Sequence, residues 1–146
     1  MRLVIDANIL VAELIRQRGR ELILNSAWEL YMPEKQWQEA CYELDKRMKI
    51  MTKKGVFSPQ TAENLWKEAL YFAELKVSFI ALEFYSHYQT IALSRIPRDP
   101  DDWHTVALAL LINAGIWTND QDFFGCGIAT WTTETLISYL IQEYNL

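Results

Sequence analysis

RLVIDAN, residues 2–8, is a short apolar run that ends in polar residues. Its core, Leu3 to Ile5, is too short for a helix and suits a buried strand, and Asp6 follows where that strand enters a loop. Similar short apolar runs occur at residues 29–32, 77–81, 116–120 and 127–131. Because these runs show little alternation of apolar and polar residues, we expect strands that are buried on both faces.

Helical patterns separate the apolar runs. Apolar residues recur at helical spacing over residues 9–18, 34–54, 58–75, 83–95 and 102–113, and a last helix follows a cap at Thr132 or Thr133. Gly19 is expected to end the first of these helices. The longest helix carries an apolar stripe of Trp37, Cys41, Leu44, Met48 and Met51. Strands that alternate with helices predict the α/β class, with a mainly parallel sheet of roughly five strands covered on both faces.

The composition is that of a globular protein. The chain has 146 residues, 51% of them hydrophobic, and it has no linker, repeat or low-complexity stretch. We therefore expect a single domain over residues 1–146. No apolar run approaches the roughly 18 residues of a membrane helix, so the sequence favours a soluble cytoplasmic protein with no membrane partner.

The charge of the chain restricts its function. A net charge of −5 counts against a protein that grips long nucleic acids over a broad surface. It does not exclude a nuclease, because acids gathered at one site would leave the rest of the molecule nearly neutral. Basic residues are concentrated at residues 16–20 and 46–54, and the sequence alone favours solvated helix faces for both runs over an RNA-binding track.

Acids recur where the predicted strands end. Asp6 follows the first strand, Asp120 and Asp122 follow the fourth, and another group precedes the buried helix: Asp99, Asp101 and Asp102. The carboxyl ends of parallel strands meet at one edge of a sheet, so we expect these side chains to converge. Close carboxylates repel one another unless protons or cations intervene, and Mg²⁺ and Mn²⁺ prefer oxygen ligands. The sequence therefore predicts a site for divalent cations.

Each acid also has an ordinary structural explanation. Asp6 suits a turn, Asp102 suits a helix N-cap, and Asp99 and Asp101 suit a loop. The pair in TNDQDF, Asp120 and Asp122, suits an Asx turn. Only the joint placement of these acids carries the prediction of a site.

Four segments, in this order, resemble the PIN-domain family of ribonucleases: LVIDANIL (residues 3–10), YMPEKQWQEACYEL (31–44), DPDDWHTVALAL (99–110) and IWTNDQDF (116–123). The resemblance spans nearly the whole chain. It implies a three-layer α/β/α sandwich whose acidic pocket binds Mg²⁺ or Mn²⁺ and cleaves single-stranded RNA with a metal-activated water. Whether one ion or two act stays open.

The resemblance also implies roles for individual residues. The catalytic acids would be Asp6, Glu39, Asp102 and Asp120, and the metal ligands Asp6, Asp102, Asp120 and Asp122. Asn8, Thr118 and Asn119 match polar positions of the pocket, and Asp99, Asp101 and Glu43 are secondary candidates. On a helical wheel Glu39 lies far from the apolar stripe of its helix, so Glu43 stays open as the second motif acid. His104 is interpreted as structural and His87 as a surface residue.

Several functional classes remain open at this stage. Many proteins that resemble this chain are toxins of toxin–antitoxin pairs of the VapC type, which implies a small antitoxin partner and a homodimer. A PIN fold that binds RNA or protein without cutting is the alternative. A receiver domain would need an aspartate after the third strand, where this chain has Glu83.

Overall fold

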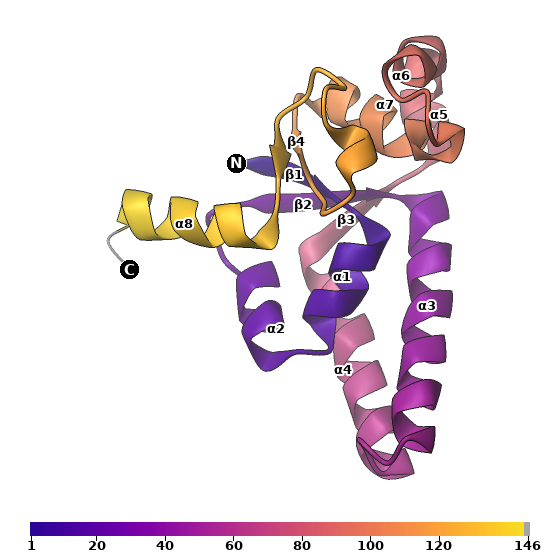
Figure 1. The fold of residues 1–146 in the computed structure, drawn as a ribbon, viewed down its shortest axis with the longest axis vertical. Helices are drawn as coiled ribbons and strands as arrows, with labels where there is room; N and C mark the ends of the chain where they lie inside the picture. The colour runs from indigo at the N-terminus through magenta and orange to yellow at the C-terminus, as the bar shows by residue number, and fades with distance from the viewer. Residues whose placement is uncertain (145–146) are drawn as a thin grey trace.

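A five-stranded parallel sheet forms the centre of the molecule (Figure 1). The computed structural model describes residues 1–144. The sheet has the order β3-β2-β1-β4-β5, and its strands are β1 (Arg2–Ile5), β2 (Glu29–Pro33), β3 (Val77–Ile80), β4 (Gly115–Trp117) and β5 (Thr130–Trp131). All four paired neighbours run parallel.

Helices cover both faces of this sheet (Figure 1). One face carries α1 (Ala7–Leu14), α2 (Gln17–Ile23), α3 (Glu34–Lys53), α4 (Pro59–Lys76) and α8 (Thr133–Tyr144). The other carries α5 (Leu82–Tyr85), α6 (Gln89–Arg95) and α7 (Trp103–Ile112). Three short 3₁₀ turns complete the chain, at Ser86–Tyr88, Pro100–Asp102 and Gln121–Phe123. The three-layer α/β/α prediction is confirmed.

The first strand contributes side chains to two separate hydrophobic cores. Leu3 and Ile5 lie in the core beneath α1 to α4, whereas Val4 lies in the core beneath α5 to α7, because successive strand residues point to opposite faces. All three side chains are 0% exposed. Helix α7 is buried over seven consecutive residues, Trp103 to Ala109, as its apolar composition predicts. None of the helices described is long and apolar enough to cross a membrane.

Two predicted helices differ from those observed. The helix expected to stop at Gly19 ends at Leu14, and Gly19 lies inside α2. A Cβ at this position would overlap the carbonyl oxygen of Glu13, so the glycine permits close packing of α2 on α1 and does not terminate a helix. The helix expected over residues 83–95 is interrupted by the 3₁₀ turn at Ser86–Tyr88.

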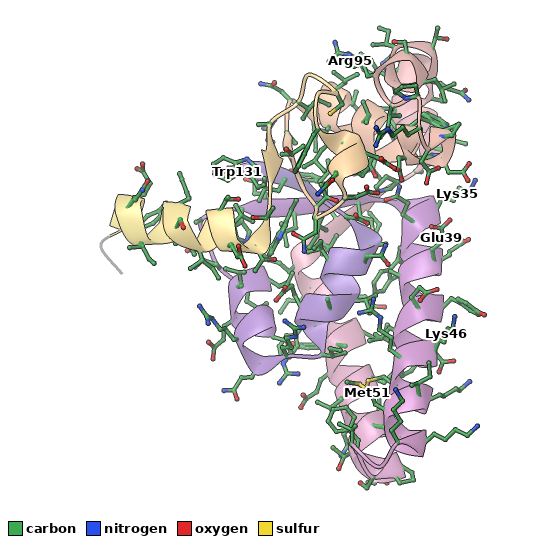
Figure 2. The ribbon with its side chains drawn as sticks, viewed as in Figure 1. Lys35, Glu39, Lys46, Met51, Arg95 and Trp131 are labelled. Atoms are coloured by element: carbon green, nitrogen blue, oxygen red, sulfur yellow. The ribbon has the colours of Figure 1, made fainter. Side chains whose placement is uncertain are left out.

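Helices α3 and α4 form a long hairpin that extends away from the sheet (Figure 1). The buried positions of α3 are Ala40, Leu44 and Met48, which shifts its inner face slightly from the predicted stripe. Small residues of α4, Ala62, Ala69 and Ala73, are buried too and allow the helices to approach closely. The opposite, outer side of α3 carries Lys35, Glu39 and Lys46 (Figure 2).

Candidate metal centre

The order in which the chain adds strands to the sheet changes side between β1 and β4. From β1 the chain continues to β2 and β3 on one side of the sheet, and it later returns to β4 and β5 on the other. Crevices at the carboxyl ends of strands on either side of such a switch point are the usual ligand sites of open α/β sheets. Asp6 follows β1 here, and Thr118 follows β4.

Thr118 joins the two strand ends. Its buried hydroxyl donates a 2.8 Å hydrogen bond to Oδ2 of Asp6 and accepts one of 3.0 Å from the backbone N–H of Asp120. Oδ1 of Asp6 accepts from the N–H of Asn8 at 3.2 Å, which caps α1. Both carboxylate oxygens of Asp6 are therefore engaged, and its position relative to Asp120 is fixed.

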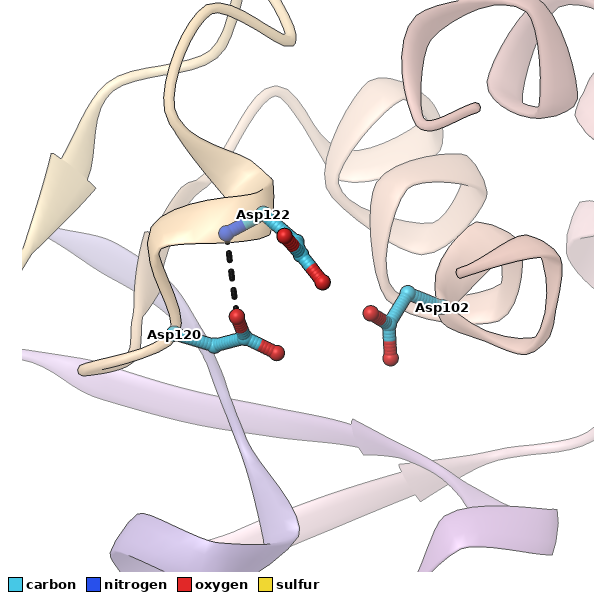
Figure 3. A group of neighbouring side chains, drawn as sticks. All are labelled: Asp102, Asp120 and Asp122. Atoms are coloured by element: carbon cyan, nitrogen blue, oxygen red, sulfur yellow. Dashed lines mark hydrogen bonds between the residues drawn. The ribbon is translucent and has the colours of Figure 1, made fainter. Parts of the chain in front are cut away.

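Three carboxylates converge beside Asp6. Ligand oxygens of Asp102, Asp120 and Asp122 lie within 4.8 Å of one another. Oδ1 of Asp120 accepts from the N–H of Asp122 at 2.9 Å, and its other oxygen is directed toward Asp102 (Figure 3). The Asx turn expected as an ordinary explanation is thus present, yet it leaves one oxygen of Asp120 free for the site.

Asp102 is the most perturbed acid of the group. Its Oδ2 atom is buried and has no hydrogen-bond partner among the described residues. Its pKa is raised to about 7, chiefly by burial and further by the charges of four neighbours: Asp99, Asp120, Asp6 and Asp122. Asp102 occupies the N-cap position of α7 as predicted, but its side chain makes no capping bond there, so capping does not account for its carboxylate.

Asp6 is perturbed in the same direction. Burial raises its pKa, and the charge of Asp120 raises it further, whereas the hydrogen bonds from Thr118 and Asn8 lower it. These donors stabilise the ionised carboxylate of Asp6. The described residues provide no such donor for Oδ2 of Asp102. The closest trio consists of Asp102, Asp120 and Asp122, and Asp6 lies beside it in the same cleft.

A cleft of about 690 Å³ opens over these acids. Asp6, Asp102 and Asp120 line it, together with Asn8 and with the secondary candidates Asp99, Asp101 and Glu43. Asp99 also caps the turn before Asp102, because its Oδ1 accepts from the N–H of Asp101 at 3.2 Å. Asp122 lies at the edge, where Arg98 approaches its carboxylate at 3.6 Å.

Helix α3 supplies the opposite wall of the cleft. Gln36, Glu39 and Glu43 recur at steps of three and four, and all line the cleft. The amide of Gln36 donates to the hydroxyl of Thr105 at 2.8 Å, which holds the start of α3 against α7. Glu39 can therefore face the acids although it lies far around the helix from the buried stripe.

Asn119 does not reach this cleft. It lines a separate hollow of about 710 Å³ on the side of Glu13, Thr133 and Asn25. Thr118 and Asn119 are neighbours in extended backbone after β4, so their side chains point in opposite directions. Of these two predicted pocket residues, neither lines the cleft: Asn119 lines the separate hollow, and Thr118 is a buried support behind the acids.

The sequence did not single out several other residues of the cleft. Lys35 lies one turn of α3 before Glu39, Tyr42 lies about one turn after it, and both line the cleft. Their only sequence signal is helical spacing from Glu39. His104 also lines the cleft, and its Nδ1 lies 2.8 Å from the Tyr85 hydroxyl. Burial and the charge of Lys35 lower the pKa of His104, consistent with a neutral, structural histidine.

The donor set suits a divalent cation. Hard cations such as Mg²⁺ and Mn²⁺ take carboxylate oxygens and keep several waters. Asp102 has a buried oxygen for which the described residues supply no donor, and its carboxylate lies within reach of Asp120 and Asp122, so it suits such an ion. In metal-free protein the same oxygen would have to hold a proton or remain uncompensated.

The parallel α/β/α fold thus places a carboxylate-lined cleft, a candidate metal centre, at its switch point. The family model of the PIN domain matches residues 4–141, so the chain belongs to the PIN-domain family. This confirms the resemblance drawn from the four sequence segments. PIN domains are generally nucleases and typically use divalent metals. None of the curated proteins matches the chain.

Proposed function

We propose that this protein is a metal-dependent endoribonuclease that cleaves single-stranded RNA with Mg²⁺ or Mn²⁺. The observation that carries the proposal is the state of Asp102. Its buried oxygen has no donor within residues 1–144, and its pKa is raised to about 7 by burial and by four surrounding carboxylates. Such an arrangement is unfavourable unless a proton or a cation compensates the charge, and strongly perturbed carboxylates of this kind cluster at functional sites.

Each wall of the cleft has a part in this proposal. Asp102, Asp120 and Asp122 would hold the cation, and Asp6 would add negative charge from the end of β1. A divalent ion held there would supply an activated water and would offset charge on the phosphate oxygens. Glu39, on the opposite wall, would orient that water and accept its proton, with Glu43 as the alternative. Lys35 would contact the phosphate from the same helix.

A cleavage assay tests the proposal directly. Unstructured RNA is incubated with the protein in Mg²⁺ or Mn²⁺ and, in parallel, in EDTA, and products are separated on a denaturing gel. We expect cleavage only with metal, and a loss of at least about 100-fold in kcat in Asp6→Asn and Asp102→Asn. Glu68→Gln is the control, because Glu68 is an exposed acid of α4 that does not line the cleft.

The outcomes separate an enzyme from a binding module. Circular dichroism must show that each variant remains folded before its activity is interpreted. Cleavage that persists in Asp6→Asn and Asp102→Asn would reject the site. Wild-type protein that binds RNA and metal but never cuts would instead favour the non-catalytic alternative.

The proposed activity also suggests a biological role. Acting in the cytoplasm as the toxin of a toxin–antitoxin pair, the protein would form a homodimer whose acidic cleft is blocked by a small antitoxin. Only family membership supports this extension. Induced expression should then arrest growth, Asp102→Asn should not, and co-expression of the product of an adjacent small reading frame should restore growth. Equal growth with wild-type protein and Asp102→Asn would exclude the toxin role.

A further inference from the structure

A second hollow continues from the acidic cleft along the outer face of α3. It has a volume of about 390 Å³ and is lined by Tyr42, Asp45, Lys46, Lys49, Ile50 and Lys53. Tyr42 lines both this hollow and the acidic cleft, so the two adjoin at its ring. Whatever occupies the cleft therefore has an open path toward the tip of the hairpin.

The residues along this path share one face of the helix. Tyr42, Lys46, Lys49 and Lys53 follow one another at steps of four, three and four. At about 100° per residue these positions fall within roughly 60° of one another, and Lys35 and Glu39 belong to the same side. Figure 2 shows Lys35, Glu39 and Lys46 along this outer side of α3. We call Tyr42, Lys46, Lys49 and Lys53 the α3 stripe.

The groups of the α3 stripe are available to a ligand. The Tyr42 side chain is 67% exposed, although it is a large aromatic residue beside the cleft. Among the described residues, no carboxylate lies within 4 Å of Lys46 or Lys53, and only Lys49 pairs, with Asp45 at 2.8 Å. The stripe is therefore a line of positive charge on a protein whose net charge is −5.

We propose that single-stranded RNA leaves the acidic cleft along the α3 stripe, with a base stacked on Tyr42 and phosphates on the three lysines. This inference rests on the proposed function and names where its substrate binds. An exposed aromatic ring followed by spaced cations is how proteins hold single strands without reading their sequence. From Tyr42 to Lys53 the helix rises about 16 Å, enough for several nucleotides.

The composition of the stripe favours RNA over an acidic protein segment. Lysines alone would suit either ligand, but Tyr42 supplies a flat ring at the junction with the cleft, where a nucleobase flanking the cut would lie. The carboxylates of the cleft repel a polyanion in the absence of metal. Cations on the adjacent surface would offset that repulsion and would steer the substrate toward the site.

The first experiment measures binding apart from cleavage. Full-length protein is titrated into a labelled, unstructured RNA of about 15 nucleotides in EDTA, by fluorescence anisotropy at several salt concentrations. Single strands lose affinity with a log–log salt slope of about −0.7 per phosphate contacted. The triple variant Lys46→Ala, Lys49→Ala, Lys53→Ala should therefore flatten the slope by about 2. Tyr42→Ala should raise Kd roughly 5- to 100-fold, and Tyr42→Phe should restore most of the affinity.

A charge-matched control distinguishes the stripe from net charge alone. Arg18→Ala, Lys54→Ala, Lys67→Ala removes three exposed cations that do not line the hollow. We expect this variant to keep the wild-type salt slope. Equal slopes in the stripe variant, the control variant and the wild type would overturn the inference, and so would equal flattening in both variants.

The second experiment uses cleavage of RNAs of two lengths. The stripe variants should raise KM several-fold more for the RNA of about 15 nucleotides than for one of about three, which cannot span the stripe. Wild-type cleavage with identical KM changes at both lengths would overturn the inference and leave the proposed function intact. RNA binding through the stripe without any cleavage by wild-type protein would support the inference and contradict the proposed function.

Discussion

Two acids on opposite faces of the sheet differ in the hydrogen-bond donors that surround them. Glu13 of α1 is only 8% exposed, yet its Oε1 accepts a hydrogen bond from the Thr133 hydroxyl at 3.2 Å. That hydroxyl accepts in turn from Nε1 of Trp117 at 3.1 Å. Asp102, before α7, has a buried Oδ2 with no such donor. The Glu13 carboxylate is held by one neutral donor, and the Asp102 carboxylate faces further carboxylates.

The difference separates a structural acid from a functional one. A buried carboxylate that accepts hydrogen bonds contributes to a unique packing and needs nothing from solution. A buried carboxylate surrounded by like charges is unfavourable until a proton or a cation arrives. Burial alone therefore does not identify a site. The absence of donors, together with the convergence of acids from separate segments, is the better indicator.

The largest expected effect is stabilisation by metal. Mn²⁺ at about 100 times its Kd should stabilise the wild type by roughly 2.7 kcal/mol, because it binds the folded cleft only. At about 2–4 °C for each kcal/mol, the melting temperature should rise by several degrees relative to EDTA. Asp102→Asn should lose this rise, and Glu13→Gln should keep it. A similar rise in Asp102→Asn would show that the metal binds elsewhere.

Removing the donor of Glu13 should have the next largest effect. Thr133→Val leaves Glu13 and the indole N–H of Trp117 without their shared partner. An unsatisfied buried polar group costs about 1–3 kcal/mol, so the melting temperature should fall by several degrees with or without metal. Thr133→Ser keeps the hydroxyl and is the control. Unaltered stability in Thr133→Val would mean that solvent satisfies Glu13.

The smallest effect should be the pH dependence of the metal-free protein. The pKa of Asp102 is about 7 in the fold, against its ordinary value of 3.8. The folded state therefore binds this proton more tightly than the unfolded state, so its contribution is complete below about pH 4 and is lost as pH rises through 7. In EDTA, Asp102→Asn should melt a few degrees above the wild type at pH 8, and the difference should vanish near pH 4.

This pH comparison has a clear contrary result. If Asp102→Asn melted below the wild type at pH 8 in EDTA, the ionised carboxylate would be stabilised in the metal-free fold. Other acids also titrate across this range, so the difference between the two proteins is the relevant quantity. Melting by circular dichroism at matched ionic strength supplies it.

The sequence predicted the convergence of Asp6, Asp102 and Asp120 because the rule behind it is topological. Parallel strands place their carboxyl ends at one edge, whatever the side chains in between. The finer arrangement depends on rotations that no spacing encodes. Asn119 is turned to the far side by the alternation of extended backbone, and Asp122 enters the close trio through the turn that Asp120 caps.

The residue spacing along each helix was predictable from the sequence, but the way the helix stands against the sheet was not. The spacing of α3 gave its length and its apolar stripe, yet the part of its outer face that meets the cleft depends on how α3 stands against the sheet. The bond between Gln36 and Thr105, residues 69 apart in sequence, helps to set that orientation. Lys35 and Tyr42 were therefore missed. Gly19 was misread because a glycine needed for close packing resembles one that ends a helix.

The sheet ends in a strand of only two residues, β5. A free sheet edge exposes unpaired backbone groups to which another chain can add a strand, and a long, flat edge invites aggregation. The two residues of β5 expose too few unpaired backbone groups to fix the alignment of an added strand. Crowding or mild heating should therefore not propagate fibres from this edge, and any assembly there would depend on side chains.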